Sequence, residues 1–243
     1  MTSTLMTQVT QVTQTTRLNA DFDQRVVVAP ATAQSWVASP LPGVQRHMLD
    51  RIGDEVARAT SVVRYAPHSA FERHTHGGGE EFLVLDGVFS DEHGHYGQGS
   101  YVRNPPGSAH TPYSTPGCTL FVKLWQFAPT DLQHVHIDTQ HTPWHPGLVP
   151  GLRVMPLHEH DGVSSALVQW APHTRFNAHM HVGGEEILVL EGLFRDEHGA
   201  YPAGTWLRNP RGSRHQPYTG AEGALIYVKV GHLGASFMAP PGL

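Results

Sequence analysis

The sequence predicts an all-β protein in which two similar units, each a sandwich or barrel, lie in one chain. Three observations support this fold class. The apolar runs are short and rich in β-branched and aromatic residues, and turn signals containing Gly and Pro separate them. Sustained apolar periodicity of 3.6 residues, which would indicate amphipathic helices, is hard to find. The sequence also repeats itself, as expected for two copies of one fold.

The internal repeat is long and almost without gaps. Residues 166–199, ALVQWAPHTRFNAHMHVGGEEILVLEGLFRDEHG, match residues 61–94, SVVRYAPHSAFERHTHGGGEEFLVLDGVFSDEHG, at an offset of 105 positions. The same offset relates YVRNPPGSAHTPY at residues 101–113 to WLRNPRGSRHQPY at residues 206–218. Each unit is therefore roughly a hundred residues long, which is an ordinary size for a domain with its own core.

Composition and turn signals divide the chain. Residues 1–20 are rich in Thr and Gln, offer little to bury, and predict a disordered tail. The join between the repeats lies near HTPWHPGLVPG, where Pro and Gly punctuate the chain. We therefore expect a first domain over residues 21–135 and a second over residues 136–243.

Within each unit the apolar runs give the expected strands in order. They are SVVRY (61–65), EFLVLDGVF (81–89) and TLFVKLWQF (119–127) in the first unit, and ALVQW (166–170), EILVLEGLF (186–194) and ALIYVKV (224–230) in the second. The turn signals between them include GGG, DEHG, NPPGS, STPG and NPRGS.

Charge and hydropathy exclude several classes of partner. The net charge is −5 and the pI is near 6.4, and no run of Lys or Arg could follow a phosphate backbone or a lipid surface. No apolar segment approaches the ~18 residues of a membrane span, and the N-terminus lacks the pattern of a signal peptide. We expect no nucleic-acid or membrane partner and a cytoplasmic location. The one cysteine, Cys118, begins an apolar run and is expected to be a buried structural thiol.

The 19 histidines include pairs with metal-ligand spacing. His74 and His76 project from the same face of a strand, and the glycines that follow permit a tight reversal that returns Glu80 beside them. His110 stands at the start of a later strand. These four positions recur in the second unit, so the predicted metal ligands are His74, His76, Glu80, His110, His179, His181, Glu185 and His215.

A single His-x-His pair on a strand is commonly no more than exposed polar surface. Here the four ligand types recur at identical spacing while their neighbours differ, with Thr75 replaced by Met180 and Gly77 by Val182. That contrast favours metal sites. Imidazole and carboxylate donors suit Fe, Mn, Co, Ni, Cu or Zn.

The two copies carry the motifs of the cupin superfamily, which the sequence resembles from about residue 30 onward. The first cupin motif, G-x5-H-x-H-x3,4-E-x6-G, is met by HTHGGGEEFLVLDG and HMHVGGEEILVLEG, apart from the leading Gly. The second motif, G-x5-P-x-G-x2-H-x3-N, is met except at its last position, where Ser114 and Thr219 stand. Its matched residues are Gly99, Pro105, Gly107 and His110, then Gly204, Pro210, Gly212 and His215.

Among cupins, the sequence of the repeat is most similar to the cupin domain of ChrR-type anti-sigma factors and to small dioxygenases that cleave β-diketones. The resemblance implies a bicupin, with two tandem double-stranded β-helix (jelly-roll) barrels. It implies one divalent transition metal in the mouth of each barrel, with Fe(II) favoured and Zn, Mn or Ni as alternatives. ChrR-type proteins grip the sigma factor with an N-terminal helical zinc domain that uses paired Cys. With no CxxC here, we expect no sigma-factor binding.

Three functions remain open at this point. A metal held by three His and one Glu keeps open positions, which is typical of a reactive site. The favoured hypothesis is therefore a non-haem metal-dependent dioxygenase acting on a small chelating oxygenated substrate. The alternatives are a non-catalytic ChrR-like metal or small-molecule sensor without a sigma-binding domain, and a storage or scaffold bicupin.

Four further residues are candidates for substrate binding. Arg103 and Arg208 precede NP in both copies and are expected either to bind a substrate carboxylate bidentately or to form structural salt bridges. Tyr113 and Tyr218 follow the last ligand by three positions and are expected either to donate to the substrate or to pack in the barrel. Self-association into a homodimer is also expected, with contact between the two barrels of one chain as the alternative.

Overall fold

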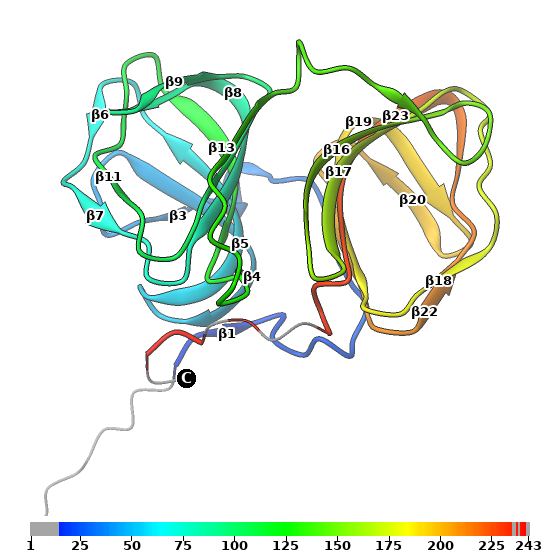
Figure 1. The fold of residues 1–243 in the computed structure, drawn as a ribbon, viewed down its shortest axis with the longest axis horizontal. Coiled ribbons are helices and arrows are strands. Elements are labelled where there is room, and N and C mark those ends of the chain that lie inside the picture. The colour runs from blue at the N-terminus through cyan, green and yellow to red at the C-terminus, as the bar shows by residue number, and fades with distance from the viewer. Residues whose placement is uncertain (1–14, 235–236, 238, 242–243) are drawn as a thin grey trace, which may run out of the picture.

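The computed structural model describes residues 15–234, 237 and 239–241. Figure 1 shows two β-barrels side by side, the first drawn from blue to green and the second from yellow-green to red. Among the described residues the only helical segment is the 3-10 turn η1 (Ala33–Ser35). The structure confirms the predicted all-β class and the two tandem jelly-roll barrels.

The first barrel consists of an 11-stranded sheet with the main order β1-β4-β5-β13-β8-β10-β14 and a two-stranded sheet of β7 and β11, counted over the described residues. Its strands are β1 (Arg17–Leu18), β3 (Val37–Ala38), β4 (Val44–Gly53), β5 (Ala57–Tyr65), β6 (Ser69–Ala70), β7 (His74–Thr75), β8 (Glu80–Asp91), β9 (Gly94–Gly97), β10 (Ser100–Asn104), β11 (Ala109–His110), β12 (Tyr113–Ser114), β13 (Cys118–Leu124) and β14 (Val135–Asp138).

The second barrel repeats this plan with an eight-stranded sheet of main order β15-β16-β17-β23-β19-β21-β2 and a two-stranded sheet of β18 and β22. Its strands are β2 (Val26–Val28), β15 (His145–Pro146), β16 (Leu152–His160), β17 (Val163–Trp170), β18 (His179–His181), β19 (Glu185–Asp196), β20 (Gly199–Pro202), β21 (Trp206–Asn209), β22 (Ser213–His215) and β23 (Tyr218–Val230).

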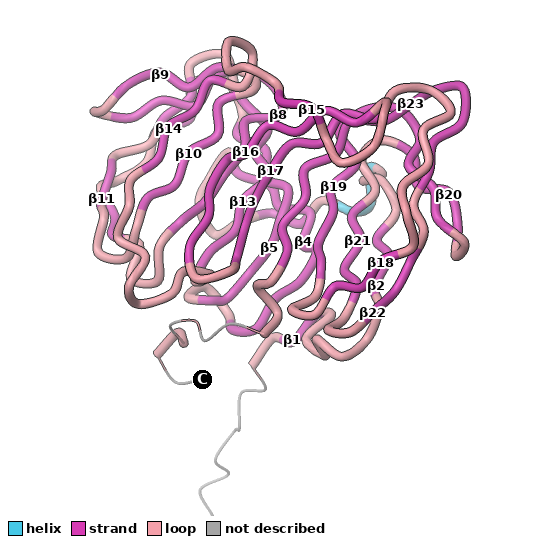
Figure 2. Tube along the Cα trace, turned by 45° about the vertical axis from the view of Figure 1, so that its right-hand side comes forward, coloured by secondary structure: helices cyan, strands magenta, loops and turns pink. Residues whose placement is uncertain are grey.

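Each barrel completes its sheet with a strand from the other half of the chain. β2 lies near the N-terminus but pairs antiparallel with β21 of the second barrel. β14 follows the last long strand of the first repeat and pairs antiparallel with β10 of the first barrel. Figure 2 shows the two pairings at opposite ends of the molecule. We call this arrangement the reciprocal strand exchange; it ties the two barrels together through the backbone.

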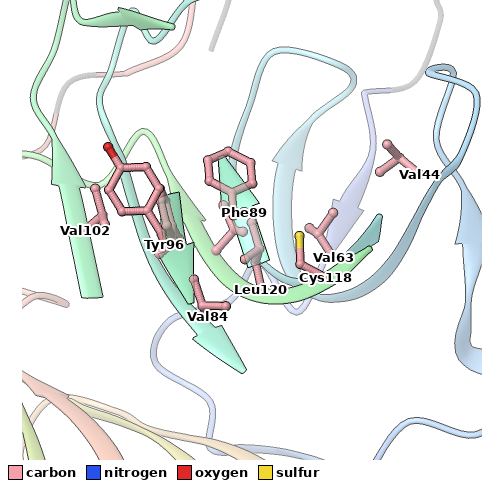
Figure 3. Packing of buried hydrophobic residues seen from close by; sticks show 10 residues of the cluster. Val44, Val63, Val84, Phe89, Tyr96, Val102, Cys118 and Leu120 are labelled. Atoms are coloured by element: carbon pink, nitrogen blue, oxygen red, sulfur yellow. The ribbon is translucent and has the colours of Figure 1, made fainter. Parts of the chain in front are cut away.

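Alternation along the strands sorts side chains between three apolar cores. Phe82 and Val84 of β8 point into the first barrel, whereas Leu83 between them joins a core shared by both barrels. Figure 3 shows the first interior, where Phe89, Leu120 and their neighbours pack together. The second barrel has its own interior around Ile187, Val189, Phe194 and Ile226. The shared core holds Leu49, Leu83, Tyr101, Phe121, Met155, Leu157, Leu167, Leu188, Trp206 and Tyr227.

Two buried ion pairs cross this shared core. Lys229 Nζ of the second barrel donates to Glu81 Oε2 of the first at 2.5 Å. Lys123 Nζ of the first donates to Glu186 Oε1 of the second at 2.5 Å. All four side chains are at most 2% exposed. Such pairs stabilise only when every charge finds partners, because removing an ion from water costs several kcal/mol.

The first of these pairs is charged at neutral pH. Burial raises the pKa of Glu81, but Lys229 and Arg103 outweigh it and hold that pKa well below its usual range. Burial lowers the pKa of Lys229 to about 8, with Glu81 opposing the shift. Tyr101 and Tyr227 also donate their hydroxyls to Glu81, at 2.9 and 2.6 Å. The carboxylate therefore accepts from both barrels at once.

Several smaller expectations can be compared with the structure. Residues 1–14 of the predicted tail lie outside the described residues, whereas Arg17–Leu18 form β1 and pair with β4, so this part of the predicted tail belongs to the first sheet. Cys118 is 3% exposed and free, as expected of a structural thiol, and burial raises its pKa to about 11. No helix among the described residues is long and apolar enough to cross a membrane.

Replacing Lys123 by Met should lower the free energy of unfolding by about 3–5 kcal/mol, because Glu186 would keep a buried charge without its cation. Denaturant unfolding measures the change. Arg211→Met is the control, since Arg211 pairs at 3.5 Å with Asp23 and the two side chains are 56% and 75% exposed; its loss should cost about 1 kcal/mol or less. Equal losses in the two variants would show that the crossing pair does not stabilise the docked barrels.

Candidate metal centres

The first cluster brings together the four predicted ligands of the first unit. β7 supplies His74 and leads to His76, and β11 pairs with β7 so that His110 lies opposite His74. The Nε2 atoms of His76 and His110 are 3.0 Å apart, and Glu80 Oε2 lies 3.4 Å from His76 Nε2 and 3.8 Å from His110 Nε2. The nitrogen ligand atoms of the three histidines all lie within 4.8 Å of one another.

The second cluster repeats this geometry. β18 carries His179 and His181, and His215 lies opposite His179 on β22. The Nε2 atoms of His181 and His215 are 3.0 Å apart. Glu185 contributes Oε1 at 3.4 Å from His181 Nε2 and Oε2 at 3.5 Å from His215 Nε2. We call the two clusters the first and the second centre.

A glycine turn returns each glutamate to its histidines. Gly79 has a φ of +78° and Gly184 a φ of +77°, a conformation that side chains with a Cβ rarely adopt. A Cβ on Gly79 would also meet the Phe127 ring at 2.5 Å, and one on Gly184 would meet Leu233 at 2.6 Å. The turns therefore need glycine for both backbone conformation and space.

The donor set fits a transition-metal ion. Two nitrogen ligands, each about 2.1 Å from one ion, lie about 3.0 Å apart at a right angle and about 3.4 Å apart at a tetrahedral angle. The Nε2 separations of 3.0 Å and most of the Nε2–carboxylate distances match these values. Three imidazoles and one carboxylate would leave two positions of an octahedral ion open to other ligands.

Polar partners behind the ligands fix how the imidazoles are oriented. The carbonyl oxygen of Glu72 lies 3.2 Å from His74 Nδ1, and that of Asn177 lies 2.9 Å from His179 Nδ1. Each carbonyl accepts a hydrogen bond from Nδ1–H, which leaves Nε2 free to act as a ligand. Asp91 Oδ2 lies 3.1 Å from His110 Nδ1 in the same way.

The amide side chains of two asparagines hold the glutamates. Asn104 Nδ2 donates to Glu80 Oε2 at 3.3 Å, and Asn209 Nδ2 donates to Glu185 Oε2 at 2.9 Å. Hydrogen bonds of this kind fix the position of a ligating carboxylate.

Burial favours the neutral form of three of the six histidines. Burial lowers the pKa of His76, His179 and His181, which favours the neutral form that binds metal. Burial also disfavours charge on His110, but the hydrogen bond with Asp91 and the charge of Glu80 outweigh it and raise its pKa. At the first centre, metal binding therefore competes with a proton more strongly at His110 than at His76.

The first centre opens onto a cavity of about 400 Å³. His76 and His110 are among the residues that line it, and its wall also includes His93, His134 and His136. Those three wall residues are exposed to solvent. A second cavity of about 460 Å³ lies between the barrels and is lined mainly by aliphatic side chains, away from both centres. The histidine-lined cavity therefore offers a polar molecule a route to His76 and His110 of the first centre.

The structure places Arg103 and Arg208 in the interface between the barrels. Arg103 borders the first cavity, but its two terminal nitrogens donate to Glu81 and Asp131. Arg208 is 0% exposed, and its terminal nitrogens donate to Asp50 Oδ2 at 3.3 Å and to a backbone carbonyl oxygen at 2.8 Å. These contacts favour the structural salt bridge over the substrate carboxylate that we considered for both residues.

Tyr113 and Tyr218 are half-buried and pack against neighbouring side chains. The Tyr113 ring lies edge-on to His95 at 6.3 Å, and the Arg175 guanidinium lies 4.8 Å from the centre of the Tyr218 ring. Among the described residues, no hydrogen bond links either hydroxyl to a ligand. Their contact with substrate stays a prediction. The contacts with His95 and Arg175 agree with the alternative, packing in the barrel.

Sequence reasoning missed four residues that support the ligands. Asp91 and Asp196 lie in the DEHG segments, which were interpreted only as turns, and Asn104 and Asn209 lie in the RNP segments, of which only the arginine was singled out. Each pair keeps the offset of 105 residues, as the ligands do. The repetition of these polar residues at the offset of the ligands was the signal that could have identified them.

The fold and the two centres define a bicupin. The family model described as the ChrR Cupin-like domain matches the chain twice, over residues 23–128 and 132–234. These matches span most of the sequence, so the protein belongs to this family. No curated protein matches it.

Solved structures share the fold at low identity. A "putative dioxygenase" from Nostoc punctiforme is 15% identical with a TM-score of 0.70, covering 91% of this chain and 88% of its own. The Escherichia coli pirin YhhW in complex with nickel(II) is 10% identical with a TM-score of 0.61, covering 85% and 99%. An oxalate decarboxylase from Lactobacillus farciminis in a formate complex is 12% identical with a TM-score of 0.55, covering 84% and 85%. At these identities the likeness shows the fold alone.

We expect the purified protein to hold about two divalent transition-metal ions per chain, because two complete ligand sets are present. His76→Ala and His181→Ala should each halve the metal content, and the double variant should lose it, as measured by plasma mass spectrometry. His141→Ala is the control, since this histidine is 80% exposed and lies outside both centres. A double variant that keeps its metal would refute the assignment.

Asp91→Asn should weaken metal binding at the first centre by about 10- to 100-fold, because the amide no longer holds the His110 imidazole as a carboxylate does. Competition with a chromophoric chelator gives the affinity. The matched control is Asp138→Asn, which makes the same change beside an exposed histidine at the surface. Unchanged affinity in Asp91→Asn would show that Asp91 does not support the metal site.

Proposed function

We propose that this bicupin is a non-haem metal-dependent dioxygenase that acts on a small oxygenated substrate able to chelate the metal. The observation that carries the proposal is the first centre, where three histidines and a glutamate come together and two of them, His76 and His110, line a cavity of about 400 Å³. A purely structural metal site is usually closed by protein ligands, whereas a reactive one keeps open positions.

The residues of this centre have distinct tasks in the proposal. His74, His76, His110 and Glu80 would hold one divalent ion, with Fe(II) favoured and Zn, Mn or Ni as alternatives. When bound, a ferrous ion supplies the ability to take both the substrate and O₂ and to pass electron density between them. Asn104 and Asp91 keep the ligands in place through their hydrogen bonds to Glu80 and His110.

The cavity wall provides the polar groups for the substrate. The imidazoles of His93, His134 and His136 offer nitrogen donors and acceptors around the mouth. Tyr96 supports this wall, since its ring lies edge-on to His136 at 5.0 Å and its hydroxyl donates to Asp91 Oδ1 at 3.2 Å. A cavity of this size favours a compact molecule with two oxygen atoms that can reach one metal ion.

The similar solved structures agree with a reactive cupin without deciding its reaction. Their names include a dioxygenase, an oxalate decarboxylase and a nickel-bound pirin. The choice of dioxygenase rests on the donor set of three histidines and a glutamate and on the cavity beside it. A cytoplasmic location and self-association into a homodimer remain predictions.

The protein reconstituted with Fe(II) should consume O₂ in the presence of a small β-diketone or another chelating substrate, as an oxygen electrode records. The zinc-loaded protein and the His76→Ala variant should not, because the first lacks redox chemistry and the second lacks a ligand. A chelating compound that binds the iron-loaded protein without O₂ uptake would instead support the alternative function, a non-catalytic sensor.

A further inference from the structure

The mouths of the two centres differ at one equivalent position. In the first barrel Val135 of β14 pairs with Arg103, and His134 precedes it. In the second barrel Val26 of β2 pairs with Arg208, and Arg25 precedes it. Arg103 and Arg208 are themselves equivalent. The reciprocal strand exchange therefore places His134 at the mouth of the first barrel and Arg25 at the equivalent position of the second.

The Arg25 guanidinium binds the residues that support the second centre. Its Nη2 donates to the Tyr201 hydroxyl at 2.5 Å, and its Nε donates to Asn209 Oδ1 at 3.0 Å. The same Nη2 lies 3.7 Å from Asp196 Oδ2. Asn209 in turn donates to the ligand Glu185 at 2.9 Å. Arg25 is therefore one side chain away from the metal ligands.

The counterparts of these residues border open space in the first barrel. Tyr96 and Asn104 occupy the positions of Tyr201 and Asn209, and both line the cavity of about 400 Å³. In place of the arginine stands His134, which also lines that cavity and is exposed. The guanidinium of Arg25 thus lies, in the second barrel, where the first barrel has room for a substrate.

Arg25 is held in place by charge as well as by hydrogen bonds. Asp196 is buried, and its Oδ1 accepts hydrogen bonds from the Tyr201 hydroxyl at 2.7 Å and from the backbone N–H groups of His198 and Gly199. Its Oδ2 lies 3.7 Å from Arg25 Nη2, and the arginine side chain is 30% exposed. Moving the guanidinium aside would cost two hydrogen bonds and its contact with the buried carboxyl group of Asp196.

We infer that the two centres are not equivalent: an external chelating molecule reaches the metal of the first centre, and Arg25 closes the second. Arg25 is a positioning residue that acts on the second centre through Tyr201, Asn209 and Asp196. Where the first centre is the catalytic one, as proposed above, the second serves as a closed metal site that stabilises its barrel.

The test exchanges the two residues and counts binding events instead of turnover. Wild type, R25H and H134R are each loaded with Co(II), and acetylacetone is titrated anaerobically while the visible absorption of the cobalt is followed. Metal content is measured for every sample, because all three should carry about two ions per chain and thereby show that both barrels are folded.

We expect one equivalent of acetylacetone to bind the wild-type chain with high affinity, and two to bind R25H. In H134R the affinity at the first centre should fall by at least about 10-fold, because a guanidinium now bonds Tyr96 and Asn104. A wild-type chain that binds two equivalents equally well, an R25H chain that still binds one, or an H134R chain that binds as tightly as wild type would overturn the inference.

The outcome is independent of the dioxygenase proposal. If no sample consumes O₂ after loading with Fe(II) while the acetylacetone stoichiometry changes as expected, the proposed reaction fails and the difference between the centres stands. If wild type consumes O₂ but the acetylacetone stoichiometry is the same in R25H, the proposed reaction stands and the difference between the centres fails.

Discussion

The strict alternation of side chains at the start of β8 and β19 is the constraint on which the rest of the structure depends. Each strand begins with two glutamates. Glu80 and Glu185 turn into their barrels and join the histidines, whereas Glu81 and Glu186 turn outward and meet a lysine of the opposite barrel. A slip of one residue would exchange the two roles, leaving the centre without its carboxylate and the interface without its anion. The metal centres and the docking of the barrels are thus set by the same register.

The crossing ion pairs also make the docking specific. An apolar interface alone tolerates small rotations, but a buried charge left without its partner is strongly unfavourable. Glu81 accepts from Lys229 and Arg103, one from each barrel, and Glu186 accepts from Lys123 together with Trp206 and His232. These donors meet their acceptors only in one relative placement of the two sheets. That placement brings β2 and β14 within reach of the sheets they complete.

The sequence was sufficient for the fold class and for the residues that gather in the two clusters, because both follow from local patterns that occur twice. The His-x-His spacing, the glycine turn and the returning glutamate lie within seven residues, from His74 to Glu80, and the repeat separates them from chance. The supporting Asp91 and Asn104 obey the same repeat, but their residue types are also common in turns, which concealed them. The face on which Arg103 lies depends on strand register, and residue type alone does not give it.

The strand exchange lay beyond sequence reasoning for a different reason. β2 pairs with a strand about 180 residues later, and the first repeat becomes irregular over the segment that contains it. Pairing between such distant segments is decided by how the barrels dock, and no periodicity within the segment records that choice. Arg25 could not be placed beside Tyr201 and Asp196 without it.

Joining the two units in one chain has a consequence for how the protein can change over time. If each unit were a separate polypeptide, a symmetric pair would have to present the same residue at both mouths, because each strand would come from an identical copy. In the fused chain the segments before β2 and β14 are encoded separately, and one holds Arg25 where the other holds His134. One pocket can then be reshaped by mutation while its twin keeps its own set of histidines and glutamate. Duplication followed by fusion thus turns a symmetric assembly into a molecule whose two halves are free to diverge.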